Sequence, residues 1–143
     1  MPFEILADAP TSDVGFSASG ATLDECFRAA AEATTSVMVG DLASVRPQLR
    51  RETVIERDAL DMLLVAFLDE IVFYKDAESL FLLPQSVKVS QFEGGWKVEA
   101  HWVGEPIDPQ FHMLSGDVKA VTLHRLRVWE SDNGWHATVV LDV

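Results

Sequence analysis

The first part of the chain contains two short stretches with the pattern of β-strands. Val14, Phe16 and Ala18 alternate with small or polar residues, which predicts a strand with one buried face that ends at Gly20. Residues 49–55 combine charged positions with a run of β-branched side chains, which favours a second strand. Each of these stretches is followed by a longer segment with a different period.

Those two longer segments have apolar residues at steps of three and four, the period of a helix with one buried face. In the first, Thr22 stands three residues before Glu25, a capping-box spacing, and we expect Gly40 to end the helix in a left-handed turn. The second is expected to begin at Asp58 as its N-cap. The apolar positions are Leu23, Cys26, Phe27, Ala30, Thr34, Val37 and Met38 in the first helix, and Leu60, Leu63, Leu64, Phe67, Leu68 and Ile71 in the second.

From Leu80 onward the pattern changes to alternating runs that are typical of antiparallel strands. Gly94-Gly95 and Asn133-Gly134 predict hairpin turns, a loop is expected over residues 104–116, and a strand over residues 118–129. Two amphipathic helices beside a run of hairpins predict an α+β domain. We expect two antiparallel β-sheets, sandwich-like, with the two helices packed against them.

The composition limits the classes of partner. The chain has 143 residues, which fits one domain spanning residues 1–143, and 11 Lys and Arg against 23 Asp and Glu give a net charge of −12. Such a charge disfavours direct binding to nucleic acid or membrane and favours cations or a basic protein surface. A single Cys and the lack of an export or membrane-spanning pattern predict a cytoplasmic location.

The candidate chemistry lies near the two ends of the sequence. Standard phosphate-loop, zinc and nucleophile motifs are absent, and the four histidines are scattered. Asp142 stands next to the terminal carboxylate of Val143, and Asp13 precedes the first predicted strand, so the three would meet if the first and last strands were neighbours. Such oxygen ligands suit Ca²⁺ or Mg²⁺. The alternative is that Asp13 caps a local turn and Asp142 belongs to a frayed end.

Several blocks of the sequence resemble the archease family, and they follow one another in order along essentially the whole chain. They are Thr11-Ser12-Asp13-Val14-Gly15, then Gly20, then Thr22-Leu23-Asp24-Glu25-Cys26-Phe27, residues 58–68, Gly104-Glu105-Pro106, His112, Asp117-Val118-Lys119-Ala120-Val121-Thr122-Leu123-His124, and Leu141-Asp142-Val143. The resemblance implies a fold of two antiparallel sheets and two helices. It also implies a metal site in which Asp13, Asp142 and Val143 bind Ca²⁺, with Mg²⁺ or Mn²⁺ as alternatives.

The resemblance further implies a function. Archeases are protein cofactors, not stand-alone enzymes, and they assist the RtcB-class RNA ligase of tRNA splicing and RNA repair. They promote guanylylation of the ligase from GTP and thereby permit multiple turnover. We therefore expect a monomer that binds an RtcB-class ligase and neither nucleic acid nor membrane.

Lys119, which we place within the strand predicted over residues 118–129, is a secondary candidate for the contact with the ligase; a Lys that protects a sheet edge from aggregation is the alternative. Two positions depart from the family pattern: Pro10 replaces a His, and Leu123 replaces a Tyr. Two other functions remain open. One is a metal-dependent phosphoesterase, and the other is a general chaperone or interaction module with a structural ion.

Overall fold

Helices and antiparallel strands form in the order that the periodicity predicts. The computed structural model describes residues 2–6 and 13–143. The elements are β1 (Phe3–Leu6), β2 (Asp13–Gly20), α1 (Leu23–Met38), the short 3₁₀ helix η1 (Leu42–Ser44), β3 (Leu49–Arg57), α2 (Leu60–Glu78), β4 (Leu80–Phe92), β5 (Gly95–Pro106), β6 (Ala120–Val121), β7 (Arg127–Ser131) and β8 (Gly134–Asp142). Strand β1 was not predicted from the sequence.

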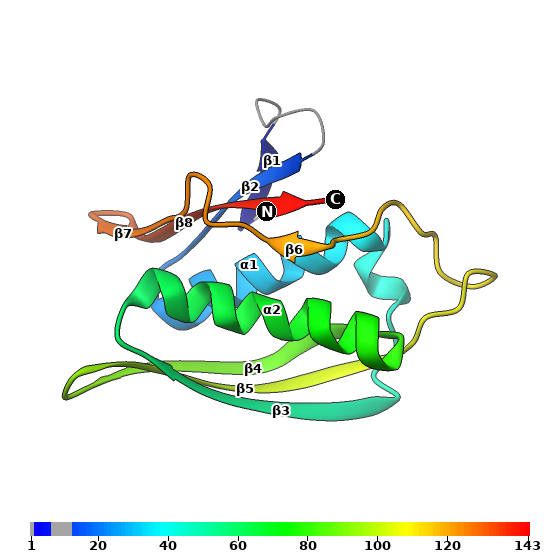
Figure 1. Cartoon of the computed structure of the whole chain (residues 1–143), viewed down its shortest axis with the longest axis horizontal. Helices are drawn as coiled ribbons and strands as arrows, with labels where there is room; N and C mark the ends of the chain where they lie inside the picture. Colours follow the sequence, from blue (N-terminus) through cyan, green and yellow to red (C-terminus); the bar gives the residue numbers. More distant parts are fainter. Residues whose placement is uncertain (1, 7–12) are drawn as a thin grey trace.

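The described strands form two antiparallel sheets with the helices between them. One sheet has the order β1-β2-β8-β6, with β7 also paired to β8, and the other has the order β3-β5-β4. Helix α1 contacts both β2 and β4, and α2 contacts strands of both sheets, so the helices form a middle layer (Figure 1). The α+β prediction is therefore confirmed.

An aromatic stack holds the middle layer to the three-stranded sheet. The Phe67 ring of α2 lies 5.0 Å from the Trp102 ring of β5 and 5.5 Å from the Phe27 ring of α1, measured between centroids. The Trp102 indole N–H donates to the Thr53 hydroxyl at 2.9 Å, and that hydroxyl donates to Glu70 at 2.9 Å. The large aromatic side chains are thus buried without leaving the indole donor unpaired.

The start of α1 agrees with the sequence. The Thr22 hydroxyl accepts from the Glu25 backbone N–H at 3.2 Å, and the Glu25 carboxylate accepts from the Ala21 N–H at 2.8 Å. These bonds satisfy backbone donors that the first turn leaves without a helical partner.

The predicted roles of Gly40 and Asp58 are wrong. Helix α1 ends at Met38, and Val39 is extended with φ −128° because it forms a β-bridge with Leu114. A contact distant in sequence therefore ends the helix instead of a left-handed Gly40. The N-cap of α2 is Ala59, which makes no side-chain cap bond, so Asp58 lies one residue outside the helix.

Both hairpins are confirmed, and Gly94 and Gly134 have positive φ values of 94° and 114° at these turns. The strand predicted over residues 118–129 is wrong, and so is the loop start at residue 104, since β5 continues to Pro106. Strands β6 and β7 pair separately with β8, and residues 122–126 stand opposite only residues 139–140. The surplus residues leave the ladder as a turn.

No helix in the described part of the chain combines the length and apolar character needed to cross a membrane.

The aromatic stack predicts a large stability difference between two positions of one helix. Phe67 is 0% exposed, whereas Phe73 on the same helix is 55% exposed. We expect Phe67→Ala to lower the free energy of unfolding by about 3–5 kcal/mol, because it leaves a cavity beside Trp102. The control Phe73→Ala should cost less than about 1 kcal/mol. Chemical denaturation measures both, and equal losses would contradict the packing described.

Candidate functional site

The pairing of β2 with β8 brings Asp13 opposite Asp142. Asp13 is the first residue of β2 and Asp142 the last of β8, and the two are Cα partners in the antiparallel ladder. Directly opposite side chains on neighbouring strands have Cβ atoms about 4.5–5.5 Å apart and share one face of the sheet. The next pair, Val14 and Leu141, faces the helices, so the carboxylates lie on the outer face.

The register places two like charges opposite each other. Like charges directly opposite each other destabilise a sheet, and neither carboxylate forms an ion pair with a described residue. A cation between them would remove the repulsion, and carboxylate oxygens are the ligands that hard divalent ions prefer. The donor set of Asp13 and Asp142 therefore fits Ca²⁺ or Mg²⁺.

Side chains alone do not complete the site. Within the described residues, no group of three or more His, Cys, Asp and Glu side chains lies close enough to hold a metal ion. The third predicted ligand, Val143, directly follows Asp142 and would contribute through its main-chain carboxylate. Its side chain lies on the opposite face of the sheet, where it lines a pocket.

Lys119 lies beside Asp142, but it stands just outside strand β6, whereas it was predicted to lie within a strand. It directly precedes β6, its backbone N–H donates to the Asp142 carbonyl oxygen at 2.8 Å, and its side chain is exposed. Among the described residues, its ammonium joins no ion pair. Leu123 is 60% exposed just after β6, and Pro10 falls outside the described residues.

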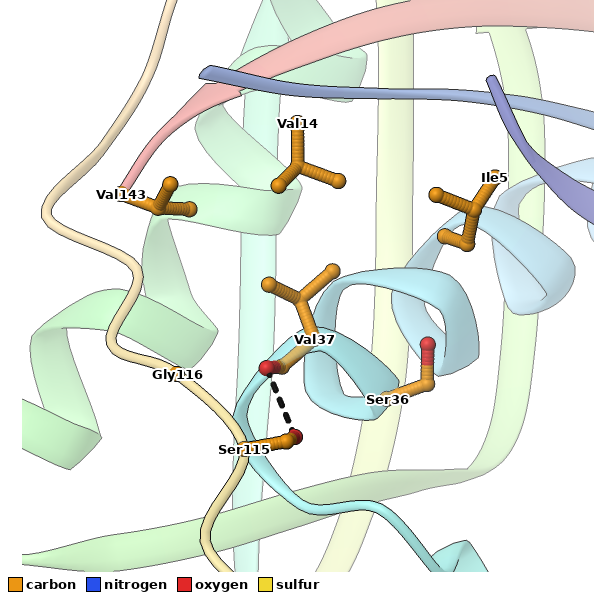
Figure 2. A pocket seen from close by; sticks show the side chains of 7 residues that line it. All are labelled: Ile5, Val14, Ser36, Val37, Ser115, Gly116 and Val143. Carbon is orange, nitrogen blue, oxygen red and sulfur yellow. Dashed lines mark hydrogen bonds between the residues drawn. The ribbon is translucent and has the colours of Figure 1, made fainter. Parts of the chain in front are cut away.

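A pocket of about 270 Å³ lies at the same end of the sheet, on the face that is turned toward the helices. Ile5, Val14 and Val143 come from the sheet side, as Figure 2 shows, with α1 and the segment 115–116 opposite them. The lining residues are Ile5, Val14, Ser36, Val37, Ser115, Gly116 and Val143. This pocket was not predicted from the sequence. One signal was available: the dipeptide Asp-Val occurs at both 13–14 and 142–143, so each carboxylate is followed by a valine on the opposite face of its strand.

The segment that forms one wall of the pocket is fixed at both ends. The Ser115 backbone N–H donates to the Met38 carbonyl at 3.0 Å, and Lys75 donates to Asp117 at 2.5 Å and to the Val118 carbonyl at 2.7 Å. Burial alone would lower the pKa of Lys75, but its bonds to Asp117 and Asp76 raise it. The lysine therefore stays charged and holds this wall in place.

An ionic cluster of the buried Glu105 and His112 with the half-exposed Arg46 fixes the start of the connection between β5 and β6. Glu105 accepts from the Arg46 backbone N–H at 2.6 Å and from the Arg46 Nε at 2.9 Å. His112 Nδ1 accepts from the Asp108 N–H at 2.9 Å, which leaves Nε2 to donate to Glu105 at 3.1 Å. Burial alone would raise the pKa of Glu105, but the bonds from Arg46 and His112 outweigh it and lower the pKa to about 2.

Glu105 and His112 belong to the blocks of sequence that resemble the family, but no contact between them was predicted. Glu105 directly follows Gly104, which continues the alternating buried positions Val98, Ala100 and Trp102, so by that alternation Glu105 should be exposed. Its partner Arg46 is 59 residues away, so no local pattern could identify the pair.

The cluster predicts a loss of stability in acid. Because the pKa of Glu105 is lowered from 4.5 to about 2, its charge stabilises the fold above pH 4.5, and this contribution is lost as pH falls toward 2. Glu105→Gln should cost about 1–3 kcal/mol at pH 7, since buried donors lose their charged acceptor. It should also flatten the dependence of stability on pH across that window.

Chemical unfolding followed by circular dichroism at several pH values between 2 and 7 measures both effects. The control is Glu130→Gln at an exposed position of β7. An unchanged pH dependence in Glu105→Gln would show that this carboxylate contributes nothing to acid stability.

The chain that carries this site is similar in sequence to proteins of a known family. A model of the Archease protein family (MTH1598/TM1083) matches residues 3–143. The protein archease of Thermococcus kodakarensis is 34% identical over 134 residues, which cover 93% of this chain and 94% of that protein. The protein archease of Methanopyrus kandleri is 34% identical over 143 residues, the whole length of both chains.

Solved structures show the same architecture. The solution structure of Methanobacterium thermoautotrophicum protein 1598 matches with a TM-score of 0.84 and 33% identity, covering 99% of each chain. A crystal structure from Thermotoga maritima, described as an archease and possible chaperone, matches with a TM-score of 0.59 over 94% of this chain and 93% of that one. At 12% identity, this second match supports the fold alone.

Proposed function

The chain belongs to the archease family, and from that premise we propose that it is a non-catalytic cofactor of an RtcB-class RNA ligase. In this role it promotes GTP-dependent guanylylation of the ligase and permits multiple turnover during tRNA splicing and RNA repair. The observation that carries the proposal is the register of β2 on β8, which pairs Asp13 with Asp142 at one end of the sheet.

Asp13, Asp142 and the main-chain carboxylate of Val143 are the proposed ligands of a divalent cation. Ca²⁺ is our first assignment, with Mg²⁺ and Mn²⁺ as alternatives, because all the donors are oxygen atoms. When bound, the ion supplies a concentrated positive charge that can organise phosphate groups. The β2–β8 ladder holds the two carboxylates on neighbouring strands, so the ligands are positioned before the partner arrives.

The charge of the chain favours a protein partner over RNA. A net charge of −12 repels a phosphate backbone but attracts a basic, nucleotide-handling cleft. The ammonium of Lys119 is an exposed cation beside this acidic end, and in the proposal it pairs with a carboxylate or phosphate at the ligase contact. The hydrogen bond from the Lys119 backbone N–H to the Asp142 carbonyl holds the Lys119 main chain beside Asp142.

One observation favours a second candidate function. An ion held by Asp13 and Asp142 would connect β2 to β8, and so would act as a structural clip in a general chaperone or interaction module. The two functions predict different results for a folded variant that lacks one carboxylate. The cofactor role predicts that stimulation of the ligase is lost, and the structural-clip role predicts that it is retained.

Single-turnover transfer of GMP to an RtcB-class ligase tests the proposal. We expect the wild-type chain to accelerate the transfer and Asp13→Ala to lose most of that acceleration at a temperature where it stays folded. Because a directly binding carboxylate is removed, its affinity for Ca²⁺ should also fall by more than about tenfold. The control Asp132→Ala removes the same charge at the β7–β8 turn, the opposite end of β8, and should behave as wild type.

Two results would contradict the cofactor role. If wild type leaves the rate of GMP transfer unchanged, the chain does not activate this ligase. If Asp13→Ala lowers the melting temperature but retains full acceleration, the ion is only a structural clip. Turnover of a phosphoester by the chain without a ligase would instead indicate an enzyme.

The contribution of Val143 has its own test. Extending the 143-residue chain with two glycines converts the Val143 carboxylate into an amide carbonyl and removes one negative charge from the proposed ligand set. Isothermal titration calorimetry should then give a weaker Kd for Ca²⁺, with the unfolding midpoint in the absence of metal unchanged. An unchanged Kd would exclude the terminal carboxylate as a ligand.

A further inference from the structure

We propose that the pocket lined by Val14, Val37 and Val143 receives an apolar side chain from a basic surface segment of the ligase. This inference rests on the proposed function, because it names how the same partner is held. In this arrangement the carboxylates on one face of the sheet and the pocket on the other face form one contact surface around the ends of β2 and β8.

The alternation of side chains between the two faces of a strand creates this two-sided surface. Asp13-Val14 lies at the start of β2 and Asp142-Val143 at the end of β8, and these strands are antiparallel. Successive residues of a strand point to opposite faces. The two carboxylates therefore lie on the outer face while the two valines line the pocket on the inner face. A partner segment that reaches the carboxylates at this edge lies next to the pocket mouth.

The pocket favours an apolar occupant. Ile5, Val14, Val37 and Val143 supply aliphatic side chains, as Figure 2 shows. The Ser36 hydroxyl donates to the Ala33 carbonyl at 2.6 Å, and the Ser115 hydroxyl donates to the Val37 carbonyl at 3.0 Å. Both hydroxyl protons are thus used within the protein. A polar ligand would give up its hydration without finding a donor among these two side chains.

The pocket is at the small end of the range for ligand sites and is large enough for one side chain. Its volume is about 270 Å³, whereas sites for small molecules and cofactors usually enclose about 300–1,000 Å³. Ile5 on the sheet side is 47% exposed, so one wall is open to an approaching protein surface. Aromatic side chains that fill well-packed pockets near the centre of an interface often carry much of the binding energy.

The walls of the pocket are formed before binding. The Ser115 backbone bond to Met38 and the Val39–Leu114 bridge join the loop to the end of α1, and Lys75 fixes the next residues. A partner therefore does not have to order this region on binding, which preserves affinity. The net charge of −12 favours a basic segment as the carrier of the anchor.

Filling the pocket tests the inference. Val37→Trp places a large ring where the anchor would bind, and Ser36→Phe is a second variant should Val37→Trp fail to fold. The control Val54→Trp adds the same ring at an exposed position of β3, in the other sheet. The probe is a fluorescently labelled RtcB-class ligase in an equilibrium titration, and Ca²⁺ calorimetry is run on the same proteins.

We expect the pocket variants to bind the ligase at least about tenfold more weakly than wild type, because they lose an anchored contact. Their Kd for Ca²⁺ should be unchanged, because the Asp13 and Asp142 carboxylates lie on the other face of the sheet and the Val143 main chain is not altered. Val54→Trp should match wild type in both measurements.

Two outcomes overturn the inference, and they can be told apart. If wild type binds the ligase and the folded pocket variants bind it equally well, the pocket is not part of the contact, while the proposed function stands. If wild type does not bind the ligase at all, the proposed function fails and this inference fails with it.

Discussion

The antiparallel register of β2 on β8 is the constraint on which the candidate site depends. Phe16 pairs with Val139 and Ala18 with Ala137, and all four are buried against the helix layer. Because the side-chain period of a strand is two, a slip of one residue would expose these side chains to solvent. The hydrophobic core therefore fixes which residues meet at the strand ends, and Asp13 faces Asp142 as a consequence.

This constraint makes the fold tolerate a pair of carboxylates that repel each other. The core behind the sheet maintains the pairing, so the repulsion is not relieved by a shift of the strands. Locally unfavourable features that the surrounding structure enforces are often functional sites. Here the pair is half-buried at the ends of β2 and β8, beside Lys119 and on the opposite face of the sheet from the apolar pocket.

Periodicity was enough to predict helices α1 and α2, and together with the turn residues Gly94-Gly95 and Asn133-Gly134 it predicted both hairpins and the α+β class. The pairing of the first and last strands was only a condition in the sequence argument, and the structure satisfies it for Asp13 and Asp142. Other features depend on contacts that no local pattern encodes. Val39 ends α1 by pairing with Leu114. The five residues 122–126 stand opposite only two residues of β8, 139–140, so they cannot all join the ladder. Glu105 contacts Arg46, which is 59 residues away in the sequence.

The central claim is that this register creates a cation site, and anomalous diffraction from crystals grown with Mn²⁺ tests it most directly. The account predicts an anomalous difference peak contacted by carboxylate oxygens of Asp13 and Asp142. A peak at other residues only, or none at Mn²⁺ concentrations that saturate binding in solution, would contradict it.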